Sequence, residues 1–492
     1  MPVSSKRLVA HLEALAQARF SKLSPAEIAV ISKSLAGEKA LCVPFSNHID
    51  INKEPDSLEN PRYGLSWSGD RVVRGEVLEW LCTSDEARAL VHSKGIQLWG
   101  ARISGGLDLS HREITFPLAL VACRFDQLLN LDNTRLPTLD LNRSWAVEIS
   151  LSGANIGGDL IFDNSVSGSI RALDISVGGS ISLLLCRITG WAGFDRANVR
   201  GDFRCLGSQF NTTWSTDHGV TDHYITLSLA SAVVDKNIVL ASLPGGPDFP
   251  LKSDGVIMLS GASCRIFQDG YFENDRSSWT KVYLSGFKYN QIVPARAEDR
   301  IEWLEHDTSH SNQPYLHLAD TLESNGDAKG AVLVRTAMEA KLTPWWQWPL
   351  KAPIGYGYRP ENALWELIGL AALGTVLYRR ARRTGRMIPT DREAYERLKA
   401  GAELPAHYPD FEPLVFSLEN TFPLVKLGQR DKWQPDTGTT VPKNEGNLLR
   451  RLLAFIESPT FLRWFVWLQV LIGWVLATLF LAAVSGLVHH SR

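Results

Sequence analysis

Between residues 95 and about 290, apolar and polar side chains alternate in short segments that recur at a fixed spacing. Apolar pairs separated by one residue recur about every ten or eleven residues, with turn residues between them. Short alternating strands at constant spacing are typical of a β-solenoid, in which stacked coils share one core. We therefore expect a mainly β fold, with a right-handed β-solenoid over residues 95–292. The predicted inward pairs are Leu107/Leu109, Leu118/Leu120, Leu129/Leu131, Leu139/Leu141, Ile149/Leu151, Leu160/Phe162 and Ile181/Leu183.

Glycines mark the same repeat. Gly105, Gly158, Gly179 and Gly201 occupy one shared pattern, in which the residues two before and two and four after the glycine are apolar or nearly so. We expect these glycines at corners where a Cβ atom would collide with the next coil.

Residues 1–94 precede the repeat and carry helix signals instead. Ser24 is suited to an N-cap, Pro25 to the first helical position, Glu27 to the third position of a capping box, and Gly37 to the C-terminal stop. A second helix is expected over residues 70–84, with Val73, Val77, Leu78 and Leu81 on one face. These signals predict an N-terminal helical cap.

Residues 293–342 follow the repeat. Leu318 and Leu322 fall on one face of a first helix, Val334 lies on a second, and Asn325-Gly326 supplies the turn between them. We interpret this segment as a helical hairpin that links the solenoid to the rest of the chain.

Residues 343–492 have the pattern of a membrane region. Residues 465–488 carry no formal charge, and as a helix they would measure about 36 Å, which exceeds a hydrocarbon core of about 30 Å. Trp464 and Trp467 would lie at the membrane–water interface. Small residues spaced four apart would let another helix approach closely. These helix-packing residues are Gly473, Ala477, Ala482 and Gly486.

A second hydrophobic helix is expected over residues 363–378. Its sixteen residues would reach only about 24 Å, and Glu366 adds a cost inside a membrane. An aromatic segment, residues 343–362, precedes it and is expected at the membrane interface. Its interface residues are Trp345, Trp346, Trp348, Tyr356 and Tyr358.

Two topologies fit these segments. The N-terminal residues lack the apolar core of an export signal, so we expect a bacterial inner-membrane, multi-pass protein whose large N-terminal part is cytoplasmic. With two spans, both ends are cytoplasmic, and the arginines at 379, 380, 382, 383 and 386 lie outside, against the positive-inside rule. The alternative is a tail anchor, with residues 363–378 resting on the inner surface.

The rest of the composition adds little chemistry. Lys and Arg number 51 against 53 Asp and Glu, so no overall field favours nucleic acid. The six cysteines contain no C-x-x-C pair, and no haem, iron–sulfur or dinucleotide pattern predicts a cofactor. A metal or acid–base site is conceivable at residues 217–223, although a solvated polar turn explains the same residues. Its members are Asp217, His218, Asp222 and His223.

Five segments in this order resemble a family of bacterial membrane-anchored pentapeptide-repeat-like proteins. They are "RVVRGEVLEWLC" leading into "GIQLWGARISGGLDL", then "YGYRP", "FSLENTFPLVKLGQRDKWQP" and "GWVLATLFLAAVSGLV". The match covers nearly the whole chain. Members often carry the automatic title "membrane-associated oxidoreductase", and their function is generally unknown.

Three functions compete. The first is a membrane-anchored scaffold whose solenoid presents a cytoplasmic surface to an unknown protein or envelope partner, with the lipid bilayer as its other partner. The second is a channel-like or oligomeric membrane module built from the two helices and residues 411–435, with a homo-oligomer formed through the membrane helices. The third is an enzyme, either a redox protein or a solenoid hydrolase.

Overall fold

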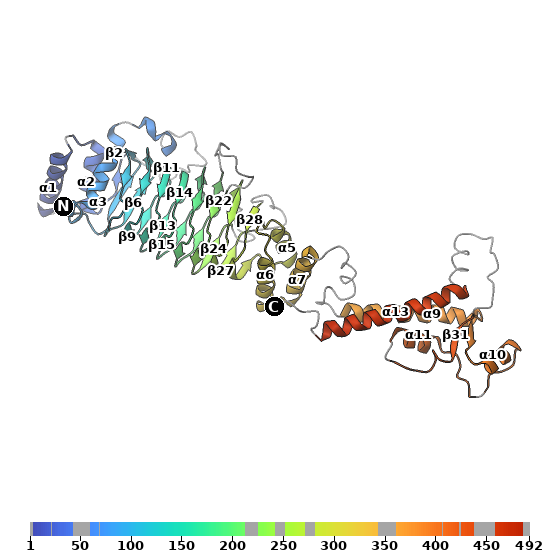
Figure 1. Ribbon diagram of the computed structural model, residues 1–492. Helices are drawn as coiled ribbons and strands as arrows, with labels where there is room; N and C mark the ends of the chain where they lie inside the picture. Colours follow the sequence, from blue (N-terminus) through green and yellow to red (C-terminus); the bar gives the residue numbers. More distant parts are fainter. Residues whose placement is uncertain are drawn as a thin grey trace. The chain divides into compact units, whose positions relative to one another are not determined.

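A computed structural model describes most of the chain (Figure 1). The described residues are 3–20, 22–42, 60–67, 69–211, 225–241, 251–270, 281–342, 361–405, 407–422, 425–436 and 458–485. The chain divides into two compact units, Met1–Val334 and Arg335–Arg492.

Helices begin the first unit, as the sequence predicts. Ser24 caps the second helix through its side chain, the capping box with Glu27 is present, and Gly37 ends the helix with a φ of 65°. The helix expected over residues 70–84 begins late, because Val73 belongs to a short strand that pairs with Arg102–Ser104. The elements are α1 (Val3–Arg19), α2 (Pro25–Ala36), β1 (Ala40–Leu41), η1 (Pro61–Ser66), η2 (Gly69–Arg71), β2 (Val72–Arg74), α3 (Gly75–Thr83) and α4 (Asp85–Arg88).

Two large parallel sheets form the body of this unit, one of 15 strands and one of 14. Partners lie one repeat apart in the chain, so that Leu139 pairs with Leu160 and Leu160 pairs with Ile181. The strands are β3 (Ile96–Trp99), β4 (Arg102–Ser104), β5 (Leu107–Asp108), β6 (Leu118–Val121), β7 (Arg124–Phe125), β8 (Leu129–Asn130), β9 (Arg135–Leu136), β10 (Leu139–Asp140), β11 (Trp145–Ser150), β12 (Asn155–Ile156), β13 (Leu160–Ile161), β14 (Val166–Arg171), β15 (Ser176–Val177), β16 (Ile181–Ser182), β17 (Arg187–Ile188), β18 (Ala192–Gly193), β19 (Asn198–Val199), β20 (Phe203–Arg204), β21 (Gln209–Phe210), β22 (Ile225–Ser228), β23 (Val233–Val234), β24 (Asn237–Val239), β25 (Lys252–Ser253), β26 (Val256–Met258), β27 (Ser263–Gln268), β28 (Lys281–Tyr283) and β29 (Lys288–Val293).

The predicted inward pairs are confirmed. All members of the seven pairs are at most 3% exposed, so the sheets share one apolar interior. Turns close the repeat at residues whose φ is positive, and these residues recur every ten or eleven positions. They are His111, Ala122, Asn133, Arg143, Gly153, Asn164, Asp174, Leu185, Arg196 and Gly207.

The glycine prediction holds at three of its four positions. A Cβ atom on Gly201 would lie 2.5 Å from the carbonyl oxygen of Gly179, and one on Gly179 would lie 2.7 Å from the carbonyl carbon of Gly158. A Cβ on Gly158 would meet the side chain of Thr138 at 2.8 Å. Gly105 differs, because a Cβ there would meet no heavy atom within 4 Å. Glycine is favoured at this position by the backbone, whose φ is 76°.

Helices follow the last strand of the first unit. Arg300 and Asp269 form a fully buried ion pair at 2.7 Å, which ties the first of these helices to the segment after β27. The expected helical hairpin is present, and Gly326 lies in its turn with a φ of 92°. The helices are α5 (Ala297–Glu305), α6 (Gln313–Ser324) and α7 (Ala328–Leu342).

The second unit is mainly helical. The helix predicted over residues 363–378 extends further at both ends, and the helix predicted over residues 465–488 begins and ends earlier in the chain. Two short strands pair antiparallel. Among the described residues, helix makes up 38% and strand 24%, so the mainly β prediction fits the parallel-sheet region but not the described structure as a whole. The elements are α9 (Glu361–Arg383), β30 (Met387–Pro389), α10 (Arg392–Lys399), α11 (Pro413–Thr421), β31 (Trp433–Pro435) and α13 (Pro459–Val484).

Candidate functional site

The proposed metal or acid–base residues Asp217, His218, Asp222 and His223 lie outside the described residues. Within the described ranges, no group of three or more His, Cys, Asp or Glu side chains is placed to hold a metal ion.

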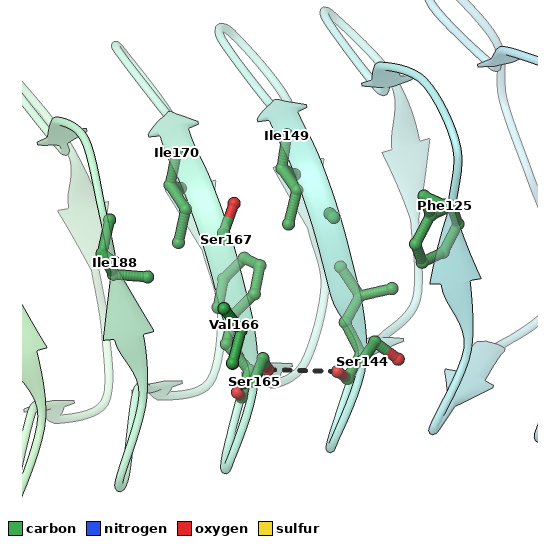
Figure 2. Close-up of a pocket in the computed structure, with 11 residues that line it drawn as sticks. Phe125, Ser144, Ile149, Ser165, Val166, Ser167, Ile170 and Ile188 are labelled. Carbon is green, nitrogen blue, oxygen red and sulfur yellow. Dashed lines mark hydrogen bonds between the residues drawn. The ribbon is translucent and has the colours of Figure 1, made fainter. Parts of the chain in front are cut away.

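A small cavity lies inside the parallel-sheet region, between neighbouring strands (Figure 2). Its volume of about 10 Å³ is close to the space that one water molecule needs. Its serine hydroxyls already donate hydrogen bonds to backbone oxygens: Ser144 to Leu120 at 2.7 Å and Ser165 to Leu141 at 3.3 Å. The remaining lining is mostly apolar, so the cavity is a packing feature of the core.

The strongest candidate site is the junction of α9, α11 and α13 in the second unit. Gln469 of α13 is fully buried and contacts both other helices. The Tyr378 hydroxyl of α9 donates to Gln469 Oε1 at 2.6 Å. Gln469 Nε2 donates to the hydroxyl oxygens of Ser417 at 3.0 Å and Thr421 at 2.8 Å, both on α11. One amide side chain therefore joins three segments that are far apart in the sequence.

Two glycines allow this close approach. A Cβ atom on Gly374 would lie 2.3 Å from Ser417 Oγ and 2.5 Å from Gln469 Nε2. A Cβ on Gly473 would lie 2.2 Å from the carbonyl oxygen of Thr421. The lack of a side chain at Gly473 therefore lets the end of α11 lie close to α13.

The other predicted packing residues are less involved. Ala477 and Ala482 are half-buried. Gly486 lies outside the described residues. Ala483, the neighbour of Ala482, packs against Ala363 of α9.

Helices α9 and α13 run antiparallel along each other. Tyr378 and Phe465 lie at one end of the pair, with ring centroids 5.9 Å apart. Ala363 and Ala483 pack together at the other end. Both helices therefore cover the same length of the unit, and Figure 1 shows α9, α11 and α13 side by side.

The exposed faces of this helix pair are largely apolar, and a small polar cluster lies among the buried apolar residues between the helices. Gln469 and Ser417 are fully buried. Exposed apolar surface of this extent is unusual for a water-soluble protein. The exposed large apolar side chains of the two long helices are Leu364, Trp365, Ile368, Leu373, Val376, Trp464, Trp467, Leu468, Leu471, Trp474, Val475, Leu481 and Val484.

Helix α11 is only nine residues long and ends beside the middle of α13, at Gly473. The chain then turns back, and the Glu419 carboxylate accepts hydrogen bonds from the backbone N–H groups of Gly428, Gln429 and Arg430 at 3.1, 2.8 and 2.9 Å. A buried carboxylate therefore fixes the loop at residues 428–430 to the short helix.

Within the described residues, one helix is long and apolar enough to cross a membrane, Pro459–Val484, which suggests membrane association. The predicted interface residues Trp464 and Trp467 are 64% and 55% exposed near its start. The other five lie outside the described residues: Trp345, Trp346, Trp348, Tyr356 and Tyr358.

The sequence reasoning missed the polar contacts of Gln469. A signal existed, since Gln469 is the only amide side chain in the apolar run 465–488, and polar groups in such runs often bond to another helix. Comparisons with protein-family models, with curated proteins and with solved structures found no match to this chain.

Proposed function

We propose that this protein is a scaffold anchored in a bacterial inner membrane. A right-handed β-solenoid over residues 95–292 presents an interaction surface in the cytoplasm, and a two-helix hairpin, α9 and α13, crosses the bilayer. The observation that carries the proposal is the extensive apolar surface that both helices expose, together with the buried polar cluster at Gln469 that joins them.

The packing of α9 on α13 supports two spans over a tail anchor. The two helices contact each other at both ends, so a bilayer that surrounds α13 also surrounds α9. Helix α9 has 23 residues, a length of about 35 Å, and its last five residues include four arginines that can extend to the headgroups. Glu366 lies in the first two turns, near the other membrane surface.

The strand registers support the solenoid. Outward residues form rows along the sheets, as where Asn155 pairs with Ser176 and Ser176 pairs with Asn198. Regular rows of exposed side chains offer a partner an extended surface. The resemblance to membrane-anchored pentapeptide-repeat-like proteins implies the same architecture, and the redox activity in that family's title stays a lesser alternative.

The proposal is tested by fractionation and site-specific crosslinking of the full chain. We expect the protein to stay in the membrane pellet after alkaline carbonate and to be released by detergent. A photoreactive residue at outward Asn155 or Asn198 should crosslink a second protein. Arg171 lies on the other sheet, and a photoreactive residue there is the control, which should not crosslink that protein. Release by carbonate would contradict the anchor, and crosslinks to nothing but the chain itself from all three positions would contradict the scaffold.

A second candidate function is a channel-like or oligomeric membrane module. The observation that favours it is the short helix α11, which packs against both long helices and is followed by a loop that bonds back to it. Planar-bilayer recordings from purified protein test it. Discrete conductance steps that disappear in a Glu419→Gln variant would support it, and a flat trace would contradict it.

A further inference from the structure

The C-terminal end of α9 carries a concentrated positive charge. Arg379, Arg380, Arg382 and Arg383 are all exposed there. Helix α13 begins beside this end and adds the exposed Arg463. Five guanidinium groups therefore lie at one end of the helix pair.

Three carboxylates of the neighbouring segment have partners other than these arginines. On α10, Glu393 pairs with Arg397 at 3.0 Å and Glu396 pairs with Arg392 at 3.3 Å. The buried carboxylate of Glu419 accepts hydrogen bonds from backbone N–H groups. Of the five arginines at this end, four form no ion pair with any residue in the described part of the chain: Arg379, Arg382, Arg383 and Arg463.

Aromatic and apolar surface adjoins this charge. Trp464 and Trp467 pack edge to face at 5.2 Å and are both largely exposed. Along the helices from them, Val376, Leu468 and Leu471 are exposed as well. Tryptophan favours the headgroup level of a bilayer, because its ring is apolar and its N–H needs a polar partner.

We propose that this arginine end binds the headgroup of an anionic phospholipid. The inference rests on the proposed membrane anchoring and adds the class of lipid. Guanidinium groups hold phosphate oxygens in pairs, while the apolar faces beside them would receive the acyl chains. That continuity favours a lipid over a soluble phosphate or an acidic protein. The proposal concerns only the headgroups at this end, so it holds for either orientation of the hairpin.

The test uses the purified full chain in a neutral detergent. Dioleoyl phosphatidylglycerol and dioleoyl phosphatidylcholine are titrated into the micelles, and the unfolding temperature reports binding. Each basic side chain near an anionic surface contributes severalfold in affinity, so we expect phosphatidylglycerol to bind at least about tenfold more tightly. The variant R379Q/R382Q/R383Q/R463Q should bind the two lipids within about twofold. The matched control R392Q/R397Q, whose arginines already pair with glutamates, should keep the preference.

Three outcomes would overturn the proposal: equal binding of the two lipids by the natural chain, an unchanged preference in the quadruple variant, or loss of the preference when soluble glycerol phosphate competes. The last would identify a site for a soluble phosphate. Phosphatidylcholine binding by the quadruple variant shows that it is folded. Membrane fractionation separates this test from the anchor, because a chain that stays in the pellet without lipid preference retains the proposed function and loses only this inference.

Discussion

At the scale of single residues, Gln469 holds the helix junction together. Replacing it with Leu leaves the Tyr378 hydroxyl without its acceptor, whereas Ser417 and Thr421 keep the backbone oxygens to which they donate. We expect Gln469→Leu to lower the free energy of unfolding in detergent by about 1–2 kcal/mol. Thr478→Val is the control, because Thr478 is exposed on the same helix and bonds only to its own turn. Equal losses in the two variants would rule out a special role for Gln469.

Glu27 governs the acid stability of the N-terminal cap. Its carboxylate accepts hydrogen bonds from the backbone N–H of Ser24 and from the backbone and guanidinium of Arg74. Burial alone would raise the pKa of Glu27, but these hydrogen bonds lower it more, so the folded pKa lies below the ordinary 4.5.

This depressed pKa predicts the direction of the pH effect. The unfolded chain binds the proton more readily, so the stabilisation is present at neutral pH and is lost as the pH falls below 4.5 through the folded value. Glu27→Gln should lower the free energy of unfolding by about 2 kcal/mol at about pH 7, a modest loss because Arg74 is partly exposed and the ion pair is screened. The loss should be much smaller at about pH 3, where the stabilisation by the carboxylate is already reduced. Chemical denaturation at both pH values measures the difference. A cost independent of pH would contradict the assignment.

At the scale of elements, a substitution in the buried face of one strand tests the assignment of the repeating strands. Leu160 is fully buried in β13 between Leu139 and Ile181. Leu160→Asp places an unpaired charge in the shared interior and should destabilise the first unit by more than about 4 kcal/mol. Its neighbour Ile161 is half-buried on the outer face of the same strand, so Ile161→Asp should cost far less. Thermal unfolding compares them, and a natural melting temperature for Leu160→Asp would refute the strand assignment.

The strand pattern was predictable because each element is decided locally. Side chains alternate with period two, so the pair Leu160/Phe162 already indicates which face is buried. Local signals also predicted α2, through Ser24 and Glu27. They misjudged Val73, whose apolar neighbours suit a helix but whose backbone pairs with β4. Partner choice of this kind depends on tertiary contacts that a single segment does not contain.

The helix junction could not be predicted in the same way. Tyr378, Ser417 and Gln469 lie in three segments separated by long stretches of chain, and their hydrogen bonds depend on how the helices pack. Helix α11 is short and lies in a Pro-punctuated segment, where length and period give little signal. The apolar character of residues 465–488 was visible, but the residue that joins it to its neighbours was not.

At the scale of the whole molecule, substitutions on the exposed face of α13 test whether that face contacts lipid or water. Leu471 and Val475 are 62% and 51% exposed. In water, arginine at two exposed positions would change stability little. At the middle of a bilayer, each arginine costs about 2.5–3.5 kcal/mol. We therefore expect Leu471→Arg/Val475→Arg to move the protein out of the membrane fraction, while the exposed control Val147→Arg leaves it there. An unchanged distribution would argue against lipid contact by this face.

Labelling of single cysteines tests most directly whether α9 crosses the membrane. The chain's own thiols should react little, because Cys82, Cys123, Cys186, Cys205 and Cys264 are all buried. Burial raises the pKa of the first three to about 12, and Cys42→Ser removes the half-buried thiol. Reporters go at two exposed positions in this background, Ala400→Cys beyond α9 and Val147→Cys in the sheets.

Intact cells are treated with a membrane-impermeant maleimide, and a second sample is treated after lysis. The two-span account predicts that Ala400→Cys reacts in intact cells and that Val147→Cys reacts only after lysis. If both positions are protected in intact cells and both react after lysis, α9 does not cross.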